Sequence, residues 1–291
     1  MGIARLEVLA AAILFGTTGT AQALGPDSST PLTVGAVRIL IGGGLLAGLA
    51  LATGGFRGRW PLRLVVVAGA GVAIYQLAFF EAVARTGVGV GAVVAIGAGP
   101  VFAGALERVF LGTAPGRVWA AATATAIAGV AVLTLGSGGT ASIAADGVAL
   151  ALVSSLGYAT YTVVAKRILH LGHTPFAVMG ASFGLGAIIL LPALVFGDTR
   201  WLGSPSGLLL ALYLGVLPTA LAYVLFARGL RRLSAAEVTT LVLAEPIVAL
   251  ILGVAVLDEQ LGPAGVVGSV LVLVGLLLLA LGQDAPRAEP G

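Results

Sequence analysis

Long apolar stretches separated by short polar connections run through nearly the whole chain. A helix needs about 20 apolar residues to cross the hydrocarbon core of a bilayer. Ten stretches come close to that length, and no connection is long enough for a soluble domain. The pattern predicts an all-α integral membrane protein with ten transmembrane helices, at residues 7–24, 31–53, 62–84, 87–111, 117–136, 146–169, 174–196, 206–229, 234–257 and 262–282.

The two halves of the chain carry matching landmarks. A shift of 146 residues pairs Phe80 with Phe226, Pro100 with Pro246, and Gly129 with Gly275. The repeated unit therefore holds five helices, and because five is odd, the second copy must enter the membrane from the opposite side. We predict two inverted five-helix repeats, residues 1–139 and 140–291.

Pro100 and Pro246 each lie near the middle of an apolar stretch. A proline removes one backbone hydrogen bond of a helix and clashes with the carbonyl four residues before it, so it bends the helix. Membrane helices tolerate single prolines, but two at equivalent positions of a repeat predict paired hinges. Inverted repeats of this kind can exchange conformations, which allows alternating access to a central site.

Composition agrees with a membrane protein, because hydrophobic residues make up 59% of the chain and charged residues 9%. Soluble domains carry about 25% charged residues. The net charge of +3 does not call for a nucleic-acid partner, since the basic residues lie between the spans. With a cytoplasmic N-terminus, twelve basic residues fall on the inner side: Arg5, Arg57, Arg59, Arg63, Arg108, Arg117, Lys166, Arg167, Arg228, Arg231, Arg232 and Arg287.

Only Arg85 and Arg200 fall on the outer side, and this bias predicts that both termini are cytoplasmic in a multi-pass protein of the cytoplasmic (inner) membrane. Trp60, Trp119 and Trp201 fall near helix ends, where aromatic belts meet the membrane surface. The start of the chain also has the features of a cleavable signal peptide. Cleavage would remove a helix whose counterpart in the second half is intact, so a retained first helix is favoured.

Two stretches contain the residues of a known family pattern: Phe80, Gly99-Pro100-Val101 and Leu111-Gly112 in the first half, and Phe226, Leu243-Ala244-Glu245-Pro246 and Leu257-Asp258-Glu259 in the second. They resemble the EamA family of the drug/metabolite transporter superfamily. The first stretch departs from the pattern, because Thr113 stands where the family has a glutamate and Glu107-Arg108 interrupts the helix end. The resemblance covers nearly the whole chain. It implies a ten-helix transporter with a central cavity, and its amino-acid-exporting branch implies amino acids as substrates.

Glu245 is the only acidic residue near the middle of a predicted span. A charged side chain at that depth costs about 2.5–3.5 kcal/mol on insertion scales, so an acid there is a candidate functional residue. It could couple transport to protons or contact a substrate amino group. The alternative is a neutral carboxyl that hydrogen-bonds a backbone carbonyl freed by Pro246.

Aromatic and polar side chains gather at similar depth in several other spans. Tyrosine in contact with lipid favours the membrane surface, so tyrosines at mid-depth are expected to face the protein or a wet cavity. Such a lining suits substrates with apolar or aromatic side chains. The candidate substrate-binding residues are Thr17, Tyr75, Gln76, Phe79, Tyr158, Tyr161, Tyr223 and Glu245. The alternative for each is helix packing.

Arg38 lies about two turns inside the second span, where it could extend to the outer surface or meet a substrate carboxylate or Glu245. Glu81 and Arg85 are four residues apart and predict a local ion pair. Three glycine pairs have a spacing that predicts close helix packing: Gly44 and Gly48, Gly87 and Gly91, and Gly180 and Gly184.

The motifs favour a transporter over other classes. The only lysine lacks a preceding glycine, so no nucleotide-binding P-loop is present and ATP hydrolysis is excluded. The chain has no cysteine and no histidine within a span, and we predict no enzyme activity, no cofactor and no metal.

The predicted function is export of amino acids, aromatic ones included, and related small metabolites by alternating access, with a small-molecule substrate and the lipid bilayer as partners. A ten-helix unit with its own cavity can act as a monomer. The alternatives are a carrier of nucleotide-sugars or other organic anions, which would need buried basic residues, and a passive channel.

Overall fold

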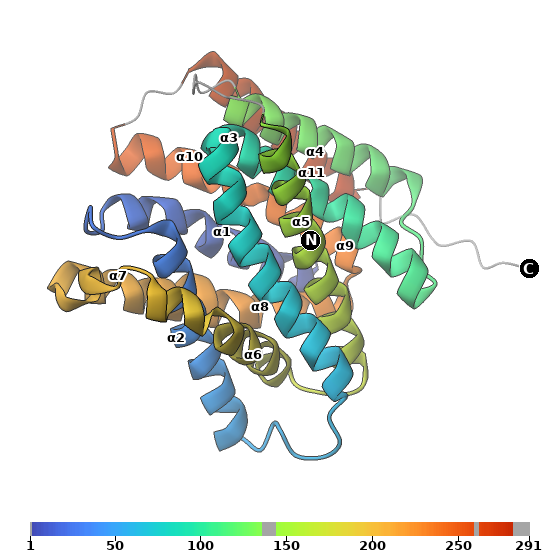
Figure 1. Cartoon of the computed structure of the whole chain (residues 1–291). Coiled ribbons are helices and arrows are strands. Elements are labelled where there is room, and N and C mark those ends of the chain that lie inside the picture. The colour runs from blue at the N-terminus through green and yellow to red at the C-terminus, as the bar shows by residue number, and fades with distance from the viewer. Residues whose placement is uncertain (1, 136–143, 259–261, 282–291) are drawn as a thin grey trace, which may run out of the picture.

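A computed structural model describes residues 2–135, 144–258 and 262–281, with the backbone alone for 87–90, 92, 93 and 133–135 (Figure 1). Glu259 and the predicted repeat boundary between residues 139 and 140 lie outside this part of the chain. All regular elements of the described residues are helical, as predicted. The first half contains α1 (Ile3–Ala23), α2 (Pro31–Ala52), α3 (Leu62–Leu111) and α4 (Arg117–Leu135).

The second half has more and shorter elements. Two of its spans are interrupted: a π-helical segment separates α7 from α8, and a 3₁₀ turn separates α9 from α10. The elements are α5 (Ala145–His170), α6 (Pro175–Phe196), η1 (Arg200–Gly203), α7 (Pro205–Gly215), η2 (Val216–Leu221), α8 (Ala222–Arg232), α9 (Ala235–Leu241), η3 (Val242–Ala244), α10 (Glu245–Val256) and α11 (Pro263–Leu281).

The structure differs from the sequence prediction at α3, which is helical without a break where two separate helices were expected. A straight helix of its 50 residues would be about 75 Å long, more than twice the bilayer core. The helix doubles back instead: a Cβ placed on Gly91 would lie 3.1 Å from the Cα of Val83, where a straight helix would separate these residues by about 12 Å. The segment from 87 to 91 alternates glycine and valine, and glycine permits such a reversal.

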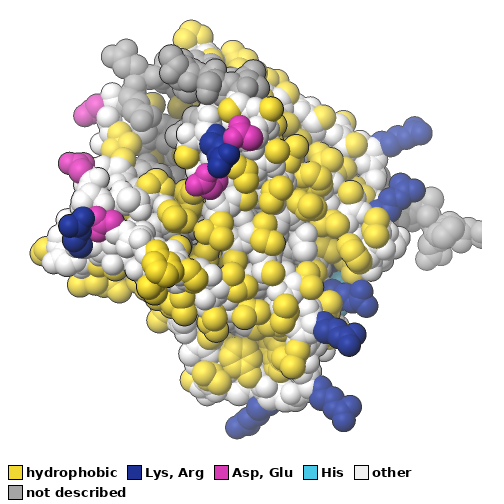
Figure 2. All heavy atoms as spheres, viewed as in Figure 1, with side chains coloured by type: hydrophobic (Ala, Val, Ile, Leu, Met, Phe, Trp, Pro, Cys, Tyr) yellow, Lys and Arg dark blue, Asp and Glu magenta, His cyan; other side chains and the backbone are white. Residues whose placement is uncertain are grey.

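Within the described residues, nine helical segments are long and apolar enough to cross a membrane, with α3 supplying two of them. A shorter apolar segment, Arg117–Val132, is the tenth. Hydrophobic side chains cover much of the surface seen in Figure 2, and most of the large ones that are exposed are leucine, valine or isoleucine. Such a surface is stable in contact with lipid chains and not in water. The prediction of an all-α membrane protein with ten spans is confirmed.

Helices at equivalent positions in the two halves pack directly on each other: α2 packs on α6, and α4 on α11. Gly129 and Gly275 make the second contact possible. A Cβ on Gly129 would lie 2.6 Å from the backbone nitrogen of Val272, and one on Gly275 would lie 2.7 Å from that of Ala126. Backbones that approach so closely are typical of small-residue contacts between membrane helices.

The prediction of close packing is wrong for one glycine pair, Gly44 and Gly48. No atom lies within 4 Å of a Cβ placed on Gly44 or Gly48, so these glycines do not pack against another helix. The contact between α2 and α6 is made by Gly43, which was not predicted, and by Gly180, which was. Each lies against the backbone of the opposite helix. A helix turns by about 100° per residue, so a neighbouring glycine faces in a different direction.

Trp201 does not lie in an aromatic belt as expected. Its side chain is buried, and its indole N–H donates to Thr33 Oγ1 at 3.0 Å. Lys and Arg side chains gather along one edge of the molecule, at the lower right of Figure 2, and most of the visible Asp and Glu side chains lie on the opposite side. We call the end that carries Arg57 and Arg59 the arginine-rich end, and the end that carries the connections 24–30 and 197–204 the arginine-poor end.

Candidate substrate cavity

A cavity of about 480 Å³ lies between the two halves of the chain. Its wall includes residues of α1, α2 and α3 from the first half and of α5, α8, α9, η3 and α10 from the second. The residues that line it near the helix ends, Gln22, Pro31 and Val83, all belong to the arginine-poor side of the bundle. The cavity therefore extends from the middle of the protein toward the arginine-poor end.

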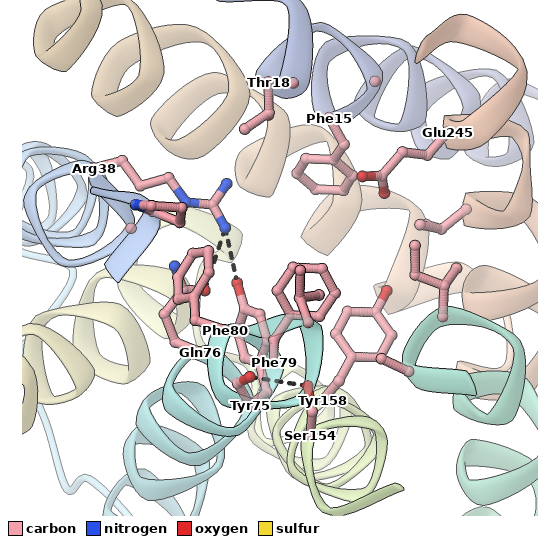
Figure 3. A pocket seen from close by; sticks show the side chains of 18 of the residues that line it. Phe15, Thr18, Arg38, Tyr75, Gln76, Phe79, Phe80, Ser154, Tyr158 and Glu245 are labelled. Atoms are coloured by element: carbon pink, nitrogen blue, oxygen red, sulfur yellow. Dashed lines mark hydrogen bonds between the residues drawn. The ribbon is translucent and has the colours of Figure 1, made fainter. Parts of the chain in front are cut away.

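Arg38 points into this cavity from α2 (Figure 3). Its Nη2 donates to the hydroxyl of Tyr75 at 3.4 Å and to Oε1 of Gln76 at 3.3 Å. The Tyr75 hydroxyl in turn lies 3.4 Å from that of Tyr223, on the second half of the chain. The guanidinium group is thus held within the protein and does not extend to the outer surface.

Glu245 enters the cavity from the opposite wall, as the first residue of α10 (Figure 3). Among the described residues, its carboxylate has no hydrogen-bond partner and no cation within 4.0 Å; these residues include Arg38, which faces it across the cavity. The alternative, a hydrogen bond from Glu245 to a backbone carbonyl freed by Pro246, is not present among the described residues. Its carboxyl group therefore remains available to a ligand.

Aromatic rings form most of the remaining wall. Phe15 and Tyr223 pack with ring centroids 4.9 Å apart, and Tyr75 packs edge-on against Tyr158 at 6.1 Å. Within the part of the chain that is described, three buried groups on the wall lack a hydrogen-bond partner: Thr18 Oγ1, Gln76 Nε2 and the Tyr158 hydroxyl. Buried polar groups are rarely left unpaired, so these groups are candidates to bind water or a ligand.

Six of the eight predicted binding residues line the cavity: Tyr75, Gln76, Phe79, Tyr158, Tyr223 and Glu245. The other lining residues, which were not predicted as binding residues, include Phe15, Thr18, Arg38 and Phe80. Phe15 and Phe80 are ordinary apolar residues in the sequence, and Thr18 stands next to the threonine that was chosen. Arg38 was noted in the sequence with two alternatives, extension to the outer surface or contact with a substrate carboxylate or Glu245.

Thr17 and Tyr161 lie outside the cavity. The Thr17 hydroxyl accepts a hydrogen bond from Tyr213 at 2.9 Å and donates to the carbonyl of Leu14, so this side chain faces α7. Tyr161 is fully buried behind the wall, with ring contacts to Tyr158 at 5.3 Å and Phe183 at 5.8 Å. It supports the wall and cannot touch a ligand in this conformation.

The two matched prolines have different local structures. Pro246 follows the 3₁₀ turn η3, whereas Pro100 lies inside the uninterrupted helix α3. The paired hinge therefore remains a prediction. A third proline, Pro218, lies in the π-helical segment, where Thr219 Oγ1 donates at 2.7 Å to the carbonyl of Leu214 that the proline cannot bond.

Contacts between the two halves close the arginine-rich end. The carboxylate of Glu107, which is buried, accepts hydrogen bonds from the backbone N–H groups of Ala235 at 2.7 Å and Ala236 at 3.0 Å. Its Oε1 also lies 4.0 Å from Nζ of Lys166. A negative charge at the first turn of a helix is favourable, because the free N–H groups point toward it. Glu107 was noted in the sequence only as a departure from the family pattern.

Two ion pairs close the same end. Arg5 and Glu237 lie 2.8 Å apart with little exposure, and Arg228 and Glu7 are also 2.8 Å apart. Each pair joins the first half of the chain to the second. At the arginine-poor end, the predicted ion pair of Glu81 and Arg85 is present at 3.1 Å, but both side chains are exposed.

The described residues contain no group of three or more His, Cys, Asp or Glu side chains that could hold a metal ion.

By its fold and cavity, the chain is a helical membrane protein with two repeats and a central cavity that is open toward one end and closed at the other. The model of the EamA-like transporter family matches the chain twice, over residues 3–135 and 145–281. The chain belongs to this family.

Several curated proteins are similar over most of their length. The "Uncharacterized transporter YwfM" of Bacillus subtilis (strain 168) is 40% identical over 285 residues, which cover 98% of this chain and 95% of that protein. A "Probable terminal-alkyne amino-acid exporter" of Streptantibioticus cattleyicolor is 29% identical and covers 84% of each chain. A solved crystal structure superimposes with a TM-score of 0.83 at 21% identity, over 98% of this chain and 99% of the other, which shows the fold alone. Family and relatives indicate a transporter rather than an enzyme.

Proposed function

We propose that this protein is a secondary transporter that exports amino acids, aromatic ones among them, and related small metabolites by alternating access. The observation that carries the proposal is the cavity between the repeats, which has an aromatic wall, opens toward one end and is closed by paired charges at the other. The similar amino-acid exporter of Streptantibioticus cattleyicolor supports the substrate class.

The size and lining of the cavity fit such substrates. Ligand pockets for small molecules measure about 300–1,000 Å³ and are mostly apolar with a few placed polar groups. The volume of about 480 Å³ and the aromatic wall agree with that description. A phosphorylated substrate such as a nucleotide-sugar would need several cations. Arg38 is the only Lys or Arg among the described residues that line the cavity, so this alternative lacks support.

The asymmetry of the two ends supports alternating access. Opening of the arginine-rich end requires Glu107 to leave the first turn of α9 and Arg5 to leave Glu237. We place the arginine-rich end in the cytoplasm of a bacterial cell, since basic residues accumulate on that side. The cavity then opens outward in this conformation, as expected after release of an exported substrate.

The test is counterflow into proteoliposomes that contain the purified protein. Liposomes loaded with unlabelled L-phenylalanine should accumulate external labelled L-phenylalanine, and excess unlabelled substrate on the outside should compete. Tyr158→Ala should lower this exchange at least about tenfold, because the ring contacts the cavity. Tyr213→Ala is the matched control, since Tyr213 bonds Thr17 outside the cavity and should retain exchange.

Several results would contradict the proposal. Exchange of another solute class with no exchange of any amino acid would refute the substrate class. Transport that does not saturate and shows no counterflow would indicate a channel. Loss of exchange in Tyr213→Ala but not in Tyr158→Ala would show that the cavity is not the transport site.

A further inference from the structure

Two opposite charges occupy facing walls of the cavity without forming an ion pair. Arg38 and Glu245 are the only Lys, Arg, Asp or Glu residues among its described lining, and no contact within 4.0 Å joins them. An isolated charge within the hydrocarbon depth is costly, and charged residues there usually pair with each other. Two charges that remain apart indicate that a third group completes the pairing.

The repeat does not account for either charge. Glu245 corresponds to Gly99 at the shift of 146 residues, and Arg38 corresponds to Ser182 at the shift of 144 that pairs Pro31 with Pro175. Neither counterpart carries a charge. The fold can therefore be built at these positions without ionisable residues.

Arg38 is held in place by groups that leave part of it free. Tyr75 and Gln76 both accept from its Nη2, so Nη1 and Nε have no hydrogen-bond partner among the described residues. A guanidinium group presents its donors in a planar fork that matches a carboxylate. Gln76 Nε2 is unpaired as well and lies beside it as a further donor. This side of the cavity therefore offers donors to an anion and no competing carboxylate.

We infer that Arg38 and Glu245 together recognise the zwitterionic head of an α-amino acid: Arg38 binds the carboxylate and Glu245 binds the ammonium group, while the side chain packs on the aromatic wall. This inference rests on the proposed function and names the residues that select the substrate. A zwitterion adds no net charge, so the loaded cavity remains neutral with every charge paired. A ligand with only one of the two groups leaves either Arg38 or Glu245 without a partner in a site shielded from water.

Tyr75 and Gln76 act here as positioning residues for the guanidinium group. Gly35 leaves the space that Gln76 occupies, because a Cβ at Gly35 would overlap Nε2 of Gln76 and the ring of Phe80. The hydrogen bond between Tyr75 and Tyr223 links this side of the cavity to the second half of the chain.

The test compares three ligands with the same ring: L-phenylalanine, phenethylamine, which lacks the carboxylate, and 3-phenylpropionate, which lacks the amine. Each competes against labelled L-phenylalanine in proteoliposomes of the full-length protein. Wild type should prefer L-phenylalanine over both analogues by about tenfold or more, the effect of one charge-assisted hydrogen bond.

The variants separate the two roles. Arg38→Gln should weaken competition by L-phenylalanine about tenfold or more and leave phenethylamine unchanged. Glu245→Gln should weaken L-phenylalanine similarly and leave 3-phenylpropionate unchanged. Arg38→Lys should recover part of the loss, because the charge remains without the fork. Glu81→Gln, at the exposed arginine-poor surface, is the matched control and should behave as wild type.

Distinct outcomes overturn distinct claims. If both variants weaken all three ligands equally, the two charges do not read the head group. If Glu245→Gln keeps its affinity for L-phenylalanine and loses only the pH dependence of transport, Glu245 couples protons and does not bind the ammonium group. If wild type exchanges no amino acid, the proposed function fails and this inference fails with it.

Discussion

Glu107→Gln should weaken the closed, arginine-rich end of the protein. The carboxylate occupies the first turn of α9, where Ala235 and Ala236 donate their N–H groups to its two oxygens at 2.7 and 3.0 Å. Glutamine has nearly the same shape, but it presents one oxygen and one NH₂ group. One of the two N–H groups must then face another donor, and the charge that favours the helix terminus is lost.

The magnitude follows from these contacts. A hydrogen bond to a charged group contributes about 1.5–3 kcal/mol, and a buried N–H without a partner costs about 1–3 kcal/mol. Lys166, 4.0 Å away, also loses the nearest negative charge to its buried ammonium group. Because these effects overlap, we expect the free energy of unfolding to fall by about 3 kcal/mol, which lowers the melting temperature by about 6 °C in a chain of this size.

Thermal unfolding of the purified protein in detergent measures this change. Glu81→Gln is the matched control, because Glu81 pairs with Arg85 at the exposed end, where both side chains are largely accessible. Exposed ion pairs contribute little, so its melting temperature should stay within about 1 °C of wild type. Equal melting temperatures for Glu107→Gln, Glu81→Gln and wild type would refute the assignment of Glu107 as a stabilising contact between the halves.

Two further predictions concern helix packing and the cavity wall. Gly129→Ala should destabilise the contact of α4 with α11 by about 1–3 kcal/mol in thermal unfolding, because the new methyl group overlaps the α11 backbone. In the control Gly44→Ala, the new methyl group meets no atom, so this variant should not be destabilised. Equal effects of the two substitutions would show that α4 and α11 do not pack this closely. The chain has no cysteine, so single-cysteine variants can be labelled without other changes. Thr18→Cys should react with a membrane-impermeant maleimide from the arginine-poor side, and L-phenylalanine should protect it. Thr17→Cys should react slowly, because that residue faces Tyr213. The reverse order of reactivity would show that the Thr17 face of α1, and not the Thr18 face, lines the cavity.

Most of the fold could be predicted because the bilayer imposes a simple rule. Backbone groups in the hydrocarbon must be hydrogen-bonded within their own helix, so each apolar stretch of sufficient length becomes a helix. The exception is α3, whose spans remain one helix through a sharp reversal near Gly91. Two separate helices were expected because one span needs only about 20 residues, and hydropathy does not show whether the connection between two spans is itself helical.

The cavity wall was harder to predict than the spans. Tyr75, Tyr158 and Glu245 were identified because polar or charged atoms at mid-depth must avoid lipid. Thr17 was chosen in place of Thr18, since hydropathy does not distinguish two threonines that differ by about 100° around the helix axis. Tyr161 is also a tyrosine and lies at a similar depth to Tyr158 in the same helix, yet its side chain is buried behind the cavity wall.

Hydropathy, helix length and the odd number of spans in each half were enough to predict ten membrane helices in two repeats, because each of them acts locally or through simple counting. The side of each helix that faces the cavity could not be predicted in this way and is set by how the helices pack together. This packing brought Arg38 of the second span opposite Glu245 of the ninth, and it placed Glu107 at the start of α9, 128 residues further along the chain. Such contacts depend on the rotation and packing of whole helices against one another, and no local pattern of residues contains that information.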